Sequence, residues 1–273
     1  MENAVVSGSF DNLKSSDIRF LEDASRFGSL HVWVWSDEVA HRLDGRSPRF
    51  PLEERKYLLQ GIRYIHQVHV VDQPFDRDTL PKLPGGDATT WVVAKDAHTS
   101  QKQQYCTSHG LKYQVVEETS LHSFPTQGNP VIDLNSVAKK VVVTGCYDWL
   151  HSGHLRFFEE ASALGDLYVV VGSDQNVRLL KGAGHPLFPQ NERRYLVQSA
   201  RYVKLALISS GSGWMDAEPE IAWLRPDKYV VNEDGDKPEK RRFCEERGIE
   251  YVVLKRIPKE GLPKRESTLL RGF

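Results

Sequence analysis

Short runs of β-branched residues alternate along this chain with segments whose apolar residues recur at helical spacing. One such run ends at Gly145, and from about Ser152 the apolar residues share one helical face, which predicts a strand, a tight turn and a helix. An order of strand, helix, strand, charged loop, helix, strand, helix and strand can be followed twice, ending near Val116 and near Leu254. Strands that alternate with helices predict an α/β fold with doubly wound parallel sheets.

The second series of elements repeats the first residue by residue. When Val5–Asp37 is aligned with Val142–Asp174, more than half of the positions carry the same residue. After a one-residue insertion the similarity continues through Arg55 and Arg193 and their neighbours. The period is far longer than that of a solenoid repeat, so we expect each copy to be a whole domain.

The repeat sets the expected domain boundaries, with domains at 1–118 and 139–273 and a linker without periodicity at 119–138. The charges are balanced, at 36 Lys+Arg against 37 Asp+Glu, which gives no electrostatic reason to expect a nucleic-acid or membrane partner. No apolar run approaches the ~20 residues that span a bilayer. Because no leader pattern is found either, we expect a cytoplasmic protein.

The turn after the central strand carries the candidate chemistry. His151 and His154 lie three residues apart on one face of the first helical turn, and Gly153 between them leaves room for a ligand beside the backbone. Free N–H groups and the helix dipole favour an anion at this place, and two imidazoles add donors that stabilise charge on phosphorus. The simpler alternative is a pair of surface histidines that cap a helix.

The motif His151-Ser-Gly-His154 after the turn Gly145-Cys-Tyr-Asp148 resembles the HxGH motif of the cytidylyltransferase-like nucleotidyltransferases. This family transfers a nucleoside monophosphate from CTP or ATP to a phosphorylated small molecule. The resemblance implies two tandem Rossmann-like domains of the HUP type and assigns catalysis to both histidines and Lys181. It also implies nucleotide contacts by Gly145, Cys146, Tyr147, Gly153, Arg193, Arg201, Ser267 and Thr268.

Two of these assignments depend on further comparison within the chain. Arg55 and Arg63 stand in the first copy where the second has Arg193 and Arg201, so a structural role for these arginines stays open. The end of the chain, Lys264-Arg-Glu-Ser-Thr-Leu-Leu-Arg271, resembles the family's late Ser/Thr motif. That resemblance implies that its two hydroxyls bind the β- and γ-phosphates.

The first copy keeps the pattern of the fold and loses the reactive groups. Lys14 and Asp17 replace the two histidines, and Asp44 replaces Lys181 in what we interpret as a phosphate-facing loop. A carboxylate repels a triphosphate. We therefore expect a degenerate first domain that packs on the second as an intramolecular pseudodimer. The tandem arrangement resembles ethanolamine-phosphate cytidylyltransferase.

The expected reaction is in-line transfer of a nucleoside monophosphate, preferably CMP from CTP, to a phosphorylated small molecule with release of pyrophosphate. Mg²⁺ is expected to arrive with the nucleotide rather than at a protein site. An adenylyltransferase that uses ATP on a sugar phosphate or cofactor precursor is the first alternative, and a non-catalytic nucleotide sensor is the second. An aminoacyl-tRNA synthetase fits poorly, because the chain is short for that class and the late motif differs from its lysine-rich loop.

Overall fold

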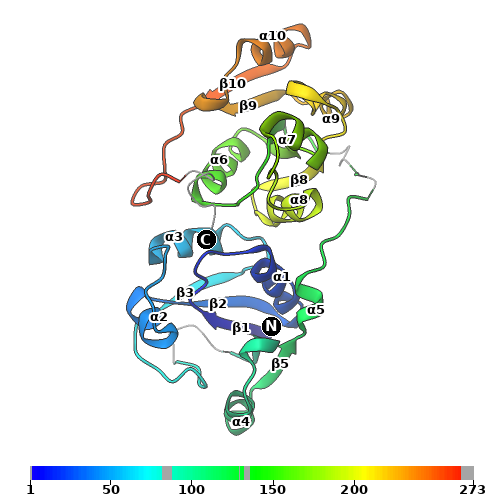
Figure 1. Ribbon diagram of the computed structural model, residues 1–273. Helices are drawn as coiled ribbons and strands as arrows, with labels where there is room; N and C mark the ends of the chain where they lie inside the picture. The colour runs from blue at the N-terminus through cyan, green and yellow to red at the C-terminus, as the bar shows by residue number, and fades with distance from the viewer. Residues whose placement is uncertain (1, 82–87, 129, 132–135, 266–273) are drawn as a thin grey trace. The chain divides into compact units, whose positions relative to one another are not determined.

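The chain forms two compact units, each built on one five-stranded parallel sheet (Figure 1). The computed structural model describes residues 2–81, 88–128, 130–131 and 136–265. The units are Met1–Ser123 and Phe124–Phe273, so the division falls inside the segment for which we expected a linker. The predicted α/β fold class with doubly wound parallel sheets is confirmed.

The first unit alternates strands with helices, η marking the short 3₁₀ turns. Its elements are β1 (Asn3–Gly8), α1 (Ser15–Ala24), η1 (Ser25–Phe27), β2 (Ser29–Trp35), α2 (Asp37–Asp44), α3 (Leu52–Gln60), β3 (Gln67–Val71), β4 (Thr90–Ala94), η2 (Lys95–Ala97), α4 (Ser100–Ser108), β5 (Lys112–Val116) and α5 (Glu118–Leu121). The strands lie in the order β3-β2-β1-β4-β5.

The second unit has the same strand order when it is counted from its own first strand. Its elements are β6 (Lys140–Gly145), α6 (Ser152–Ser162), β7 (Asp166–Val171), α7 (Asp174–Lys181), α8 (Gln190–Ser199), β8 (Val203–Ile208), η3 (Gly213–Met215), α9 (Glu218–Leu224), β9 (Lys228–Asn232), η4 (Glu233–Gly235), α10 (Pro238–Glu246) and β10 (Glu250–Leu254). The order β10-β9-β6-β7-β8 places the first strand between the second and the fourth, as in the first unit. At this position the strand order reverses, and open α/β sheets bind ligands just beyond the strand ends there.

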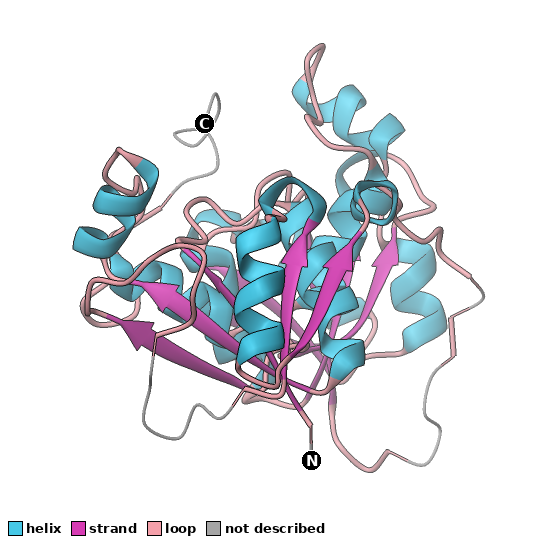
Figure 2. Cartoon of the chain, turned by 90° about the horizontal axis from the view of Figure 1, so that it is seen from below, coloured by secondary structure: helices cyan, strands magenta, loops and turns pink. Residues whose placement is uncertain are grey.

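The central strands are buried on both of their faces. Successive residues Val141, Val142 and Val143 of β6 are fully buried although their side chains point alternately to opposite sides of the sheet. Helices therefore cover both faces, and Figure 2 shows them alongside the strands. In each unit a glycine lets the chain return to the sheet, because a Cβ would lie 2.3 Å from a backbone oxygen at Gly28 and 2.1 Å at Gly165.

Three details of the predicted elements are wrong. Each unit has five strands, one more than the pattern predicted. The helix expected around residues 55–65 ends at Gln60, where Gly61 caps it. The charged loop expected to hold Lys181 is the helix α7, because Ser173 caps its start by accepting from the Asn176 N–H and Gly182, at positive φ, ends it. Among the described helices, none combines the length and apolarity that a membrane crossing needs.

Two parts of the first half of the segment expected as a linker pack on the units. Helix α5 packs against α1 in the first unit. Beyond it, the Phe124 ring lies 5.4 Å from the Tyr195 ring of α8, centroid to centroid. The Gln127 side-chain oxygen accepts a 2.7 Å hydrogen bond from the backbone N–H of Ile208, the last residue of the edge strand β8. The part in α5 thus belongs to the first unit, and the part around Phe124 and Gln127 to the second.

Candidate active site

The turn after β6 brings a tyrosine beneath the candidate catalytic histidines. Tyr147 has a positive φ of 51°, and its buried ring folds back over Gly145, where a Cβ would lie 2.8 Å from the ring. The same ring meets the His154 ring edge to face, with centroids 5.2 Å apart, and packs on Phe158. Gly145 is therefore required by the packing of Tyr147, and Tyr147 supports His154.

His151 is the N-cap residue of α6. Its Nδ1 accepts a 3.1 Å hydrogen bond from the backbone N–H of Gly153. Because Nδ1 accepts, the proton of the neutral ring is on Nε2, which leaves an N–H donor on the far side of the ring. A Cβ at Gly153 would lie 3.0 Å from atoms of the His151 ring, so a larger residue there displaces the imidazole.

His154 stacks on His151, with ring centroids 3.9 Å apart and an interplanar angle of 21°. Its Nδ1 is buried and has no hydrogen-bond partner in the part of the chain that the structure describes. A buried polar atom without a partner is unfavourable and marks a place where a ligand atom can bind. The prediction that both histidines share one face at a helix start agrees with this geometry.

Burial keeps both imidazoles neutral. Removal from water lowers the pKa of His154 to about 4; the backbone of Trp149 opposes this shift, and the positive charges of Arg256 and Lys181 add to it. Burial lowers the pKa of His151 further, and the neighbouring His154 and Arg256 add to the effect. At neutral pH the pair therefore offers N–H donors rather than positive charges.

Two cations complete the polar surface around the histidines. Lys181, the last residue of α7, is exposed, and its charge acts on His154 and on Cys146. Arg256 follows β10 and forms an ion pair with Asp234, at 2.7 Å from Nη1 to Oδ2. The structure thus places Lys181 close enough for its charge to act on His154, and it adds Arg256, which sequence reasoning missed.

Arg256 is held there by the C-terminal segment of the chain. Its Nη2 donates a 3.1 Å hydrogen bond to the backbone oxygen of Arg265. That oxygen lies 3.5 Å from the position that a Cβ would take at Gly153, so the segment crosses the start of α6. The cavity left between them measures only about 20 Å³. One feature of the sequence could have indicated this arginine. When the two series of elements are aligned, Arg256 stands opposite Glu118, so the charge at this position is reversed, as it is at Lys181.

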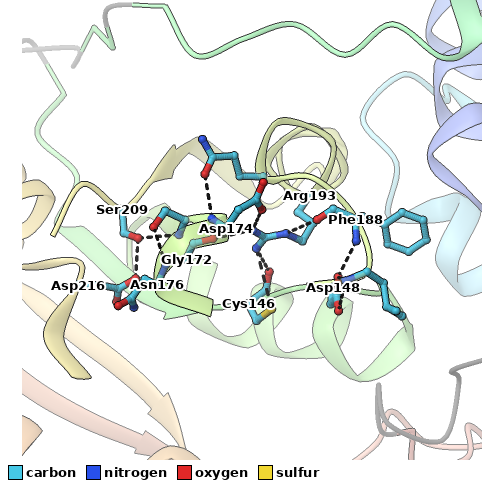
Figure 3. A network of polar contacts seen from close by, with 12 residues as sticks. Cys146, Asp148, Gly172, Asp174, Asn176, Phe188, Arg193, Ser209 and Asp216 are labelled. Carbon is cyan, nitrogen blue, oxygen red and sulfur yellow. Dashed lines mark hydrogen bonds and ion pairs between the residues drawn. The ribbon is translucent and has the colours of Figure 1, made fainter. Parts of the chain in front are cut away.

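A network of hydrogen bonds behind the turn holds its backbone (Figure 3). Arg193 is fully buried, and its guanidinium donates to the backbone oxygens of Phe188, Cys146 and Gly172 at 2.6–2.8 Å and pairs with Asp174 at 2.8 Å. Asp148 accepts from the backbone N–H groups of Leu187 and Phe188. Both charged side chains are thus used to join the turn to the segment before α8.

The first unit has the same network although it lacks the histidines. Arg55 is 1% exposed and donates to the backbone oxygens of Phe50, Ser9 and Trp35, which align with those that Arg193 contacts. Its ion pair is with Asp37 at 2.6 Å. Because this arrangement persists where the two histidines are replaced, it favours the structural role that the sequence left open for Arg193.

Some predicted contacts are not brought to the histidines. Arg201 lies in the turn before β8, at the amino end of that strand, whereas the histidines follow the carboxyl end of β6. The length of the six-residue β8, about 20 Å, separates these two edges of the sheet. Ser267 and Thr268 lie outside the described residues. Cys146 stays in the turn, half-buried, and burial raises the pKa of its thiol.

Metal binding by the protein alone has no support in the described ranges, where no cluster of three or more His, Cys, Asp or Glu side chains could hold an ion. The two carboxylates nearest the turn are already engaged. Asp148 accepts from the backbone, and Asp234 pairs with Arg256.

Known proteins resemble the second unit in sequence. The sequence model of the cytidylyltransferase-like family matches residues 142–271. The FAD synthase of Ferroglobus placidus is 35% identical over 125 residues, which cover 45% of this chain and 78% of that protein. The bifunctional protein HldE of Methylococcus capsulatus is 39% identical over 108 residues, 39% of this chain and 22% of the relative. The chain belongs to the cytidylyltransferase-like family.

The extent of these similarities differs between relatives. The match covers about a fifth of the HldE protein but most of the FAD synthase. Among solved structures, the lipopolysaccharide core biosynthesis protein from Thermoplasma volcanium GSS1 overlaps 47% of this chain and 99% of its own, with 25% identity and a TM-score of 0.38.

Proposed function

We propose that the second unit transfers an adenylyl group from ATP to a phosphate oxygen of a small-molecule acceptor. The observation that carries this proposal is the stacked pair of neutral histidines at the start of α6, one with an unpartnered buried nitrogen, beside Lys181 and Arg256. Such a surface offers N–H donors and positive charge to a polyphosphate.

The chemistry needs no general base. An anionic oxygen of the acceptor phosphate attacks the α-phosphorus, the bond from that phosphorus to the bridging oxygen breaks, and pyrophosphate leaves. The Nε2–H of His151 and the ring of His154 donate to the α-phosphate as negative charge builds on its oxygens, while Lys181 and Arg256 neutralise the phosphates around it. Mg²⁺ enters bound to the nucleotide.

The choice of ATP reverses our preference for CTP. An FAD synthase, by its name, makes a flavin adenine dinucleotide, and none of the relatives described above is named for a cytidylyl product. In addition, Arg271 stands three residues after Thr268, as in ATP-using members that the late motif resembles. CTP remains the alternative donor.

Other predicted residues take supporting roles in this proposal. Arg193 and Tyr147 position the turn and the His154 ring, and Gly145 and Gly153 let the backbone pass close to these rings. Contacts of Ser267 and Thr268 with pyrophosphate stay predictions. We also propose that the two units arose by duplication, and the packing of the first as a pseudo-partner stays a prediction.

The test is a reaction of the full chain with Mg²⁺ and either ATP or CTP. The acceptors offered are FMN, glycerol 3-phosphate, phosphoethanolamine and a hexose 1-phosphate. Pyrophosphate is measured with a coupled enzyme assay, and the products are identified by mass spectrometry. We expect pyrophosphate and an adenylylated product with ATP, and neither with the His151→Asn variant. Turnover with CTP alone would overturn the choice of donor. Tight nucleotide binding without pyrophosphate would favour the sensor.

A further inference from the structure

The first unit contains a cavity that the proposed reaction does not use. It measures about 620 Å³ and lies at the carboxyl edge of the sheet, lined by residues that end β1, by residues 91–97 of β4 and η2, and by α5. Strands β1 and β4 flank the position where the strand order reverses, which is where ligands bind in such sheets. The volume falls in the range of small-molecule pockets, about 300–1,000 Å³.

The charges around this cavity are inverted relative to the site of the second unit. Three carboxylates of the lining align with the three groups that the second unit directs at phosphate. In aligned pairs these are Asp17 and His154, Asp44 and Lys181, and Glu118 and Arg256. A ligand rich in phosphate is therefore repelled from the position that it would occupy in the second unit.

Part of this negative charge has no counter-ion. Asp44 pairs with Arg77 at 2.5 Å, and Asp17 accepts only a backbone N–H, that of Lys14, at 2.7 Å. Across the described part of the chain, the side chains of Asp96 and Glu118 form no hydrogen bond and no ion pair. The cavity therefore keeps an excess of unpaired carboxylates.

The two lysines of the lining are engaged elsewhere, whereas Arg77 pairs with Asp44. The Lys102 ammonium donates a 2.6 Å hydrogen bond to the backbone oxygen of Ala97 and lies 5.9 Å from the centre of the Trp91 ring. Burial lowers its pKa. Lys95 pairs with Glu117 at 3.1 Å. Neither ammonium thus forms an ion pair with a carboxylate of the lining.

Aromatic rings form the apolar part of the wall. The lining includes Phe10, Phe20, Trp35 and Trp91. Aromatic faces attract organic cations through the quadrupole of the ring. The Arg77 guanidinium and the Lys102 ammonium already lie 5.6 and 5.9 Å from the centres of the Trp35 and Trp91 rings, so this lining is one that cations favour. Carboxylates together with aromatic walls therefore select for a positively charged organic group over a neutral or anionic one.

We propose that the first unit binds a small organic ammonium compound in this cavity. Two carboxylates, Asp17 and Asp96, receive the ammonium group, and the aromatic rings contact its carbon body. Burial raises the pKa of Asp17, and the charge of Asp96 raises it further, so a bound cation relieves repulsion that the empty cavity retains. The proposal does not depend on the reaction of the second unit.

The test uses probes that differ only in charge. Tyramine carries an ammonium group, tyrosol is its neutral alcohol analogue, and 4-hydroxyphenylacetate is an anion of similar size; choline is a second cation. Calorimetry on the full chain gives affinities. Fluorine NMR of protein labelled with 5-fluorotryptophan reports the place of binding, because Trp35 and Trp91 line the cavity whereas Trp149 belongs to the second unit.

We expect at least one of the two cations to bind and to shift the signals of Trp35 and Trp91, with tyrosol and the anion at least tenfold weaker. The double variant Asp17→Asn, Asp96→Asn should weaken cation binding at least tenfold, since it removes both charged acceptors of the ammonium group. Asn at 17 keeps an oxygen for the Lys14 N–H. The exposed Glu38, outside the lining, provides the control Glu38→Gln, which should bind as wild type does.

Three results would overturn the proposal. The first is that neither cation binds. The second is equal binding of tyramine and tyrosol, which would assign the cavity to neutral ligands. The third is binding of ATP with shifts of the Trp35 and Trp91 signals, which would show that the inverted charges do not exclude a nucleotide.

Discussion

The two units share their framework and differ in the groups that face the carboxyl edge of the sheet. Arg55 and Arg193 make matching hydrogen bonds, although only the second unit has the stacked histidines. Even the positive φ of the turn is common to both, at Phe10 and at Tyr147. Residues that hold the fold are therefore shared by both units, and a residue present in one unit alone is the better candidate for chemistry.

The largest effect is expected where the units differ most. His151→Asn should lower turnover about 100- to 1,000-fold, because it removes a donor to the reacting phosphate. Asn is a good N-cap, so the start of α6 keeps its stability. The aligned variant Lys14→Asn, at an exposed residue of the first unit, should leave turnover within about twofold of wild type. The measurement is the steady-state rate of pyrophosphate release.

Equal effects of the two substitutions would contradict the assignment of chemistry to the second unit alone. If Lys14→Asn lowered turnover as much as His151→Asn does, the first unit would take part in the chemistry, and its degenerate character would have to be abandoned. Thermal melts of both variants separate a loss of chemistry from a loss of folding.

Much of the fold could be predicted from the sequence because it depends on local patterns. Buried β-branched runs and helical spacing identify the strands and helices of each copy. The start of α6 was placed correctly at Ser152, since the cap and the first apolar residues are close in sequence. The fifth strand and the helix α7 were missed, because these short, partly polar segments are stabilised by neighbours that the pattern does not reveal.

The candidate site could be predicted only where its parts are consecutive. His151, Gly153 and His154 come from one turn, so their spacing carried the information. Arg256 reaches the same place from the end of β10 through its hydrogen bond to the backbone of Arg265, a tertiary contact without a local signal. Arg201 fails for the converse reason, because it precedes β8 and so lies at the amino edge of the sheet, one strand length from the histidines.

The second prediction concerns what the units share. Arg193→Lys and Arg55→Lys should each lower the free energy of unfolding by about 3 kcal/mol, since lysine keeps the buried charge but cannot reach all of the oxygens that each arginine contacts. Denaturant unfolding followed by circular dichroism gives both values. A normal stability of Arg193→Lys combined with weak ATP binding would instead assign Arg193 to the nucleotide.

The smallest effect, a dependence of stability on pH, has opposite signs in the two units. In the second unit the folded state holds His154 at a pKa of about 4, below the ordinary value of about 6.5. As pH falls from the higher to the lower of these values, His154 becomes protonated in the unfolded chain but stays neutral in the folded chain. The free energy of unfolding therefore decreases. From pH 7.5 to 5 the loss is about 2 kcal/mol. His154→Asn should remove this loss.

The first unit should respond in the other direction, because burial raises the pKa of Asp17 in the aligned position. As pH rises above the ordinary carboxyl value of about 3.9, the unfolded chain releases a proton that the folded chain keeps, so stability decreases toward the raised pKa. Acidification toward the ordinary carboxyl pKa, to about pH 4, should thus stabilise wild type relative to Asp17→Asn, whereas acidification to pH 5 should destabilise it relative to His154→Asn. Urea unfolding at pH 7.5 and at each lower pH measures the two differences. Equal pH slopes for wild type and His154→Asn would mean that His154 is hydrated in the folded state, and its role as a neutral donor to phosphate would then lose its physical basis.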